Sequence, residues 1–183
     1  LGNLILNFSK LLNQKAIHKP SAQHVLDDDY YKRIEAIQFT MSHDDGKKID
    51  DINIADVILL GVSRTSKTPT SIYLANRGYK TVNIPLVLDQ KIPKDLHLNK
   101  TSCIVGLIAD PERLSDIRRN RVAIMKEQNL KDYTDLDTIK KEVDDSKKLF
   151  KKNNWPIIDV TRRSVEETAA SILKIIEIKK NKW

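Results

Sequence analysis

The segment 56–79 constrains the fold more than any other part of this chain. It opens with an apolar run that ends at Gly61, and a helical pattern follows a short polar loop and Pro69. An apolar run of this kind is typical of a strand buried on both faces of a parallel sheet. Proline is favoured in the first turn of a helix. We therefore predict a buried strand, a tight loop and a helix.

The loop 61–68, GVSRTSKT, has the spacing of a phosphate-binding P-loop, G-x-x-x-x-G-K-[ST], with Ser66 in place of the second glycine. Serine tolerates the positive φ expected there poorly. In a P-loop, backbone N–H groups and the following helix N-terminus bind phosphate. We predict that the nucleotide-binding residues are Gly61, Val62, Ser63, Arg64, Thr65, Ser66, Lys67 and Thr68. A strand-to-helix turn without a ligand is the alternative.

Two residues of this loop have further expected roles. Lys67, expected to be an exposed loop lysine, would contact the transferred phosphate and take part in catalysis. The hydroxyl of Thr68 could hold magnesium.

The remaining pattern predicts an α/β fold: a mostly parallel sheet with flanking helices. Further strands are expected at 80–85, 102–109 and 155–160, alternating with helices. We predict a P-loop-kinase-like nucleotide-binding domain at 51–183 and a helical N-terminal appendage at 1–50. In a helix after Asp27, the face of Tyr30, Ile34, Ile37 and Met41 is expected to pack on the core.

Three further groups of residues are candidates for function. His43, Asp44 and Asp45 could supply a general base, a magnesium ligand or a phosphate-accepting imidazole, although a helix exit with an Asp-Gly turn is the alternative. An arginine group after the 102–109 strand could contact phosphate or a partner, or form a solvated basic face. Parallel strands would place a second arginine pair on the same rim as the loop and Asp110. The candidate arginines are Arg118, Arg119, Arg121, Arg162 and Arg163.

Composition narrows the class of protein. The net charge of +7 suits phosphorylated ligands or an acidic partner, while an aromatic content of 5% offers few stacking platforms for nucleic acid, which we do not expect as a partner. No apolar run reaches the length of a membrane span, so no membrane association is expected. Cys103 is the single cysteine, which excludes an internal disulfide and fits a cytoplasmic location.

Four stretches carry a family resemblance: DDDYYKRIEAIQFTMSHDDG, ADVILLGVSRTSKTPTSIYLANRGYKTVNIPLV, GLIADPERLSDIRRNR and WPIIDVTRRSVEETAASIL. Together they resemble the pyruvate, phosphate dikinase regulatory protein family, which shares its pattern with the phosphoenolpyruvate synthase regulatory proteins. The resemblance implies that serine at position 66 is usual in the family. It also implies a longer N-terminal region, of which residues 1–50 would be a remnant.

The resemblance implies a bifunctional regulator. Such a protein phosphorylates an active-site threonine of the dikinase with ADP as donor, and removes that phosphate with inorganic phosphate, releasing pyrophosphate. The TRRSVEETAASIL ending and the SIYLANRGYKTVNIPLV stretch resemble the dikinase regulators more closely, which favours the dikinase as target. The same chemistry on phosphoenolpyruvate synthase, and a P-loop kinase acting on a small molecule, are the alternatives. A homo-oligomer is left open.

Overall fold

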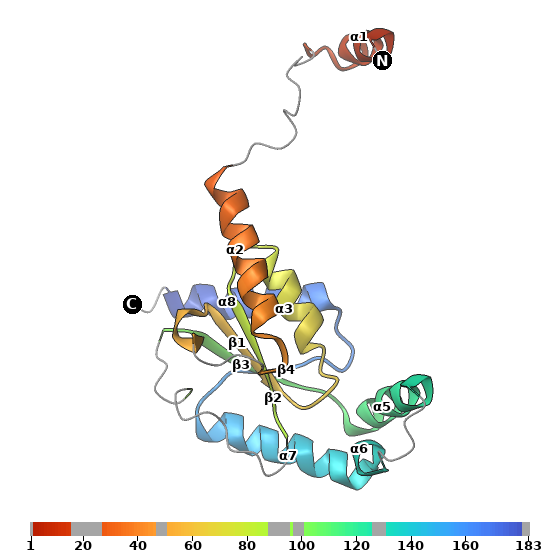
Figure 1. Cartoon of the computed structure of the whole chain (residues 1–183), viewed down its shortest axis with the longest axis vertical. Coiled ribbons are helices and arrows are strands. Elements are labelled where there is room, and N and C mark those ends of the chain that lie inside the picture. Colours follow the sequence, from red (N-terminus) through yellow and green to blue (C-terminus); the bar gives the residue numbers. More distant parts are fainter. Residues whose placement is uncertain are drawn as a thin grey trace. The chain divides into compact units, whose positions relative to one another are not determined.

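The structure is a computed structural model that describes residues 2–15, 27–46, 51–87, 96, 101–125 and 131–180. The chain divides into two compact units, Leu1–Tyr31 and Lys32–Trp183. The expected division between residues 50 and 51 stays a prediction. Figure 1 shows the elements in chain order. They are α1 Gly2–Leu12, α2 Asp28–Ser42, η1 Asp44–Gly46, η2 Ile52–Ile54, β1 Val57–Gly61, α3 Lys67–Ala75, β2 Thr81–Pro85, β3 Cys103–Ile108, α5 Pro111–Met125, α6 Lys131–Thr134, α7 Leu136–Lys152, β4 Ile157–Asp159 and α8 Val165–Lys180.

The four described strands form one sheet in the order β2-β1-β3-β4, and all neighbours are parallel. The predicted α/β fold with a parallel sheet and flanking helices is therefore confirmed. From β1 the chain moves to β2 on one side and later to β3 on the other. Such a reversal of strand order opens a crevice at the carboxyl ends of the two central strands, where ligands of open α/β sheets bind.

The two faces of the sheet have separate cores. Val57 and Leu59 of β1 belong to a buried cluster with Leu74 of α3 and Ile172 of α8. The alternate residues of β1 belong to a second cluster, which contains Phe150 of α7. Figure 1 shows α3 and α8 on one side of the sheet and α7 on the other. Because both faces are covered, β1 is apolar and buried along its whole length, as the sequence predicts.

Short polar contacts define where the helices begin. The carboxylate of Asp110 accepts hydrogen bonds from the backbone N–H groups of Glu112 and Arg113, each at 3.1 Å, at the start of α5. At the start of α8, Glu167 N–H donates to Ser164 Oγ at 3.1 Å and Ser164 N–H donates to Glu167 Oε2 at 2.9 Å. These two bonds form a capping box, in which the side chains of Ser164 and Glu167 each accept from the other's backbone N–H.

One predicted helix face is wrong. In α2 the buried residues are Ala36 and Thr40, whereas Met41 is 64% exposed. The hydroxyl of Thr40 accepts a hydrogen bond from the Thr81 backbone N–H, so a polar contact with β2 orients the helix. The predicted face of Tyr30, Ile34, Ile37 and Met41 was based on hydrophobicity alone and did not take this hydrogen bond into account.

Candidate phosphate-binding site

A cavity of about 430 Å³ lies at the carboxyl ends of β1 and β2, and the loop between β1 and α3 forms much of its wall. The strand order reverses at β1, and Arg121 of the helix that follows β3 also lines the cavity, so the cavity adjoins the crevice in which ligands of open α/β sheets bind. Its lining residues are Asp44, Asp45, Ser63, Arg64, Ser66, Lys67, Thr68, Pro69, Pro85 and Arg121.

The backbone of the loop is left-handed at two positions. Arg64 has φ 74° and Ser66 has φ 57°, values that normally favour glycine. The Ser66 side chain does not cap α3. The first turn of the helix is therefore left without the side-chain acceptor that usually occupies this place, and an anion can fill that role. Gly61 is required for another reason: a Cβ there would lie 2.5 Å from the Leu107 carbonyl oxygen.

Lys67 is buried, and the expectation of an exposed loop lysine is wrong. Lys67 is only 6% exposed, and its Nζ donates a hydrogen bond to the Val62 carbonyl oxygen at 2.9 Å. Burial lowers the pKa of the Lys67 ammonium group to about 8, an effect that the Asp45 and Asp44 carboxylates oppose. An added phosphate would supply the missing negative charge and favour the protonated form.

Thr68 is joined to a carboxylate and an amide from distant parts of the chain. Its hydroxyl donates to Asp44 Oδ1 at 3.1 Å. Asn83, near the end of β2, donates through Nδ2 to Asp44 Oδ1 at 2.6 Å and to Thr68 Oγ1 at 3.0 Å. Asn83 Oδ1 is buried and has no hydrogen-bond partner among the described residues. Three oxygen-bearing side chains thus meet at the start of α3.

This cluster fits a magnesium ion. Mg²⁺ prefers oxygen ligands and is usually bound by one or two protein side chains together with phosphate oxygens and waters. Thr68 and Asp44 would supply those protein ligands, and Asn83 holds both of them in place. Within the described part of the chain, no group of three or more His, Cys, Asp or Glu residues could hold a metal. The cluster therefore suits a cation that arrives with a phosphorylated ligand.

The neighbours Asp45 and His43 have different surroundings. Asp45 lines the cavity, and within the described residues its carboxylate accepts no hydrogen bond. His43 is 2% exposed, lies stacked on the Phe39 ring, and has Nδ1 2.7 Å from the Phe39 carbonyl oxygen. Since a carbonyl only accepts, Nδ1 carries the proton of that bond. His43 does not line the cavity.

The buried side chain of Arg118 contacts the backbone of the loop. Its side chain is completely buried, and its guanidinium donates to the Ser63 carbonyl oxygen at 3.2 Å and to Glu142 Oε2 at 2.6 Å. The guanidinium also lies over the Tyr133 ring, 4.7 Å from its centroid. The Tyr133 hydroxyl is in turn 2.9 Å from Ser63 Oγ and accepts from Arg64 Nε at 3.4 Å. Residues of α5, α6 and α7 thereby determine the position of the loop.

Comparison with known proteins places this arrangement in a family. The family described as Kinase/pyrophosphorylase matches residues 1–173. This chain belongs to the kinase/pyrophosphorylase family. The resemblance found in the sequence, to the pyruvate, phosphate dikinase regulatory proteins, is thereby confirmed.

Three relatives of this chain share the name "Putative pyruvate, phosphate dikinase regulatory protein". The protein from Pelagibacter ubique is 66% identical over 99% of this chain. Those from Erythrobacter litoralis and Caulobacter vibrioides are 52% and 48% identical over 90% and 96% of this chain. The matched regions span 66%, 59% and 56% of the three relatives, so the chain covers less than two thirds of their lengths.

The five candidate arginines of this family member do not gather at one site. Arg121 lines the cavity beside the loop, whereas Arg118 is buried with Glu142. Arg119 is exposed and lines neither of the two cavities described for this chain. Arg162 and Arg163 line the other cavity. Successive residues of an α-helix point in different directions, so Arg118, Arg119 and Arg121 of α5 have different surroundings although they are neighbours in sequence.

Sequence reasoning missed three residues that hold this family site together: Asn83, Tyr133 and Glu142. Asn83 did give a signal, since it is a polar residue inside a buried apolar strand. The other two gave none, because their partners lie far away along the chain.

Among the described residues, no helix is long and apolar enough to cross a membrane.

Proposed function

We propose that this chain belongs to a bifunctional regulator of pyruvate, phosphate dikinase. It phosphorylates a threonine of the dikinase with ADP and removes that phosphate with inorganic phosphate. One observation carries the proposal: Lys67 and the Thr68–Asp44–Asn83 cluster meet at the start of α3, at the carboxyl edge of a parallel sheet. They lie beside the loop that is left-handed at Arg64 and Ser66. The family description names both activities, kinase and pyrophosphorylase, and the relatives' names supply the target. We further propose that the domain is P-loop-kinase-like.

In the kinase direction, the threonine oxygen attacks the β-phosphorus of ADP. The bond between that phosphorus and the oxygen bridging to the α-phosphate breaks, and AMP leaves. The uncapped start of α3 and the loop N–H groups hold the phosphates, while Lys67 and Arg64 face the charge that builds up on the transferred group. Magnesium, when bound, neutralises phosphate charge beside Thr68 and Asp44.

The threonine proton needs an acceptor, and we assign this role to Asp45. Asp44 is occupied by Thr68 and Asn83, whereas Asp45 lines the cavity with its carboxylate free of hydrogen bonds among the described residues. With Nδ1 protonated, the basic atom of His43 is Nε2, and the residue is buried and does not line the cavity. A base must reach the proton that it removes, so we do not assign this role to His43.

In the opposite direction, an oxygen of orthophosphate attacks the phosphorus of phosphothreonine. The threonine oxygen leaves, takes up a proton, and pyrophosphate forms. Both reactions transfer a phosphoryl group between oxygens, and orthophosphate takes the place that the α-phosphate has in ADP. One cavity with a lysine, an arginine and a carboxylate acid–base group therefore suffices for both.

The test is calorimetric titration of ADP, ATP and AMP, with and without magnesium, against this chain and its Lys67→Ala variant. We expect ADP to bind more tightly than ATP, and binding to fall at least about tenfold in the variant, because a charge-assisted hydrogen bond is lost. Threonine phosphorylation of the dikinase, and not of phosphoenolpyruvate synthase, is then expected. A preference for ATP would contradict the proposal and favour a P-loop small-molecule kinase.

A further inference from the structure

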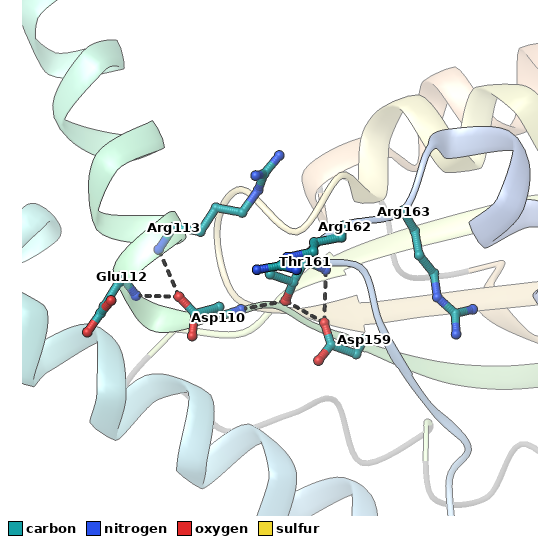
Figure 2. A pocket seen from close by; sticks show the side chains of 7 residues that line it. All are labelled: Asp110, Glu112, Arg113, Asp159, Thr161, Arg162 and Arg163. Atoms are coloured by element: carbon teal, nitrogen blue, oxygen red, sulfur yellow. Dashed lines mark hydrogen bonds between the residues drawn. The ribbon is translucent and has the colours of Figure 1, made fainter.

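A second cavity, of about 690 Å³, lies at the carboxyl ends of β3 and β4. Figure 2 shows the residues that line it: Asp110, Glu112, Arg113, Asp159, Thr161, Arg162 and Arg163. We call it the arginine cavity. Because β1 and β3 are adjacent parallel strands, it opens on the same rim of the sheet as the phosphate-binding loop. The proposed phosphotransfer does not use any of these residues.

The floor of the arginine cavity is held by bonds between the two strand ends. The Asp110 backbone N–H donates to Thr161 Oγ1 at 2.9 Å, and the Thr161 N–H donates to Asp159 Oδ1 at 2.9 Å. The turn after β4 is thus joined to the turn before α5. These hydrogen bonds hold the backbone at Asp110 and Thr161 in place, and with it the positions of the neighbouring lining residues.

Two of the three acids in the lining, Asp110 and Asp159, accept hydrogen bonds from backbone N–H groups, and among the described residues the lining arginines form no ion pair with these acids. Asp110 caps two N–H groups of α5, and Asp159 accepts from the turn after β4. Arg163 donates to the Ser171 hydroxyl at 2.9 Å. Arg113 and Arg162 form no ion pair with any described residue. Two guanidinium groups, from different elements, are therefore available to an anionic ligand (Figure 2).

The chemistry of the lining selects the ligand. Guanidinium groups bind carboxylate and phosphate through paired N–H donors. However, the three acids in the lining offset the charge of its three arginines, so the cavity has no net positive charge that would concentrate a free anion. An anionic side chain of a bound polypeptide is brought to the arginines by the rest of that protein. The lining therefore favours an anionic group carried on a protein over free orthophosphate.

We propose that the arginine cavity binds an acidic or phosphorylated side chain of the protein substrate and so positions its threonine near Lys67. The inference rests on the proposed function, which requires a polypeptide acceptor on this rim. It assigns Arg113 and Arg162 to recognition of the substrate protein and leaves nucleotide binding to the loop.

The experiment compares wild type, the double variant Arg113→Ala/Arg162→Ala and the control Arg77→Ala. Arg77 is an exposed arginine at the end of α3 and lines neither cavity. Three ligands are titrated: ADP, orthophosphate and pyruvate, phosphate dikinase. In the double variant we expect dikinase binding to fall about tenfold or more, as for two lost charge-assisted bonds, with ADP binding unchanged. The control should match wild type for every ligand.

The possible results separate the two proposals. Wild-type binding of the dikinase that survives in the double variant would overturn this inference and leave the proposed function standing. ADP binding without dikinase binding in wild type would overturn the choice of target, and the inference with it. Loss of orthophosphate binding in the double variant, with dikinase binding retained, would show that the cavity takes a free anion and would contradict the polypeptide assignment.

Discussion

The Arg118 guanidinium lies 2.6 Å from the Glu142 carboxylate, and the Arg118 side chain has no solvent exposure. The same guanidinium donates to the carbonyl oxygens of Ser63 and Tyr133. One buried cation therefore links the phosphate-binding loop to three helices. Arg118 has a structural role, because it contacts the loop backbone at Ser63 and does not line the cavity.

Removing the carboxylate should destabilise the fold strongly. Glu142→Ala leaves the Arg118 charge buried without its counter-ion, and a broken buried pair costs about 3–5 kcal/mol. Urea denaturation measures the loss. The control is Lys148→Ala, which removes the exposed pair with Asp145 on the same helix and should change stability by less than about 1 kcal/mol. Equal effects of the two variants would contradict this role of the pair.

Tyr133→Phe should weaken nucleotide binding with little effect on stability. The ring over Arg118 remains, while the hydroxyl that contacts Ser63 and Arg64 is lost. We expect ADP affinity to fall about three- to tenfold, since one neutral hydrogen bond is worth about 1 kcal/mol. Tyr73→Phe is the matched control, because Tyr73 also pairs with an arginine, Arg77. A larger loss of ADP binding in the control would argue against the assignment.

Lys67→Met should stabilise the protein and abolish phosphate binding. The pKa of Lys67 is lowered from 10.5 to about 8, so between these pH values the unfolded state binds more protons than the folded state. Wild-type stability should therefore rise with pH from about 8 to 10.5, through this group. Below pH 8 the buried ammonium group is charged, and its burial lowers the free energy of unfolding by about 3 kcal/mol.

The measurement for Lys67→Met is the difference in unfolding free energy from wild type at a series of pH values. We expect the variant to be more stable at pH 7 and its advantage to shrink as the pH rises above 8. A difference that does not depend on pH would contradict the buried, charged state of Lys67. Calorimetry with ADP on the same variant tests the loss of binding.

Asp44→Asn should remove the effect of magnesium on nucleotide binding. In wild type, removal of magnesium with a chelator is expected to weaken ADP binding about tenfold or more, because charge neutralisation at the phosphates is lost. The variant keeps the hydrogen-bonding shape but not the charge that binds the cation. Asp137→Asn, an exposed carboxylate on α7, should behave as wild type. A magnesium effect of normal size in Asp44→Asn would place the cation elsewhere.

Ser66→Gly should increase stability modestly. Ser66 is left-handed, with φ 57°, a conformation that costs a residue with a Cβ about 1–2 kcal/mol. Part of the gain is lost to the greater chain entropy of glycine, so we expect about 0.5–1 kcal/mol by urea denaturation. Ala170→Gly, in the middle of α8, should instead destabilise by about 1 kcal/mol. Destabilisation by Ser66→Gly would show that its side chain has a role that outweighs the strain.

The local features of this chain could be predicted from sequence, because each depends on residues close together. Short apolar runs indicated the four described strands, and Pro69 indicated the first turn of α3. Periodicity was less reliable in α2. There the buried side is defined by Thr40, through its hydrogen bond to the Thr81 backbone.

The sequence by itself determined the strand, loop and helix order, the parallel sheet and the family, since these follow from local patterns and a distinctive motif. Only the tertiary structure decided which charges serve the site. It brings Asp44 to Thr68 and Asn83, buries Arg118 against Glu142, and separates Arg162 from Arg121. The physical reason is that the dielectric surroundings and partners of a charged side chain depend on packing between distant segments.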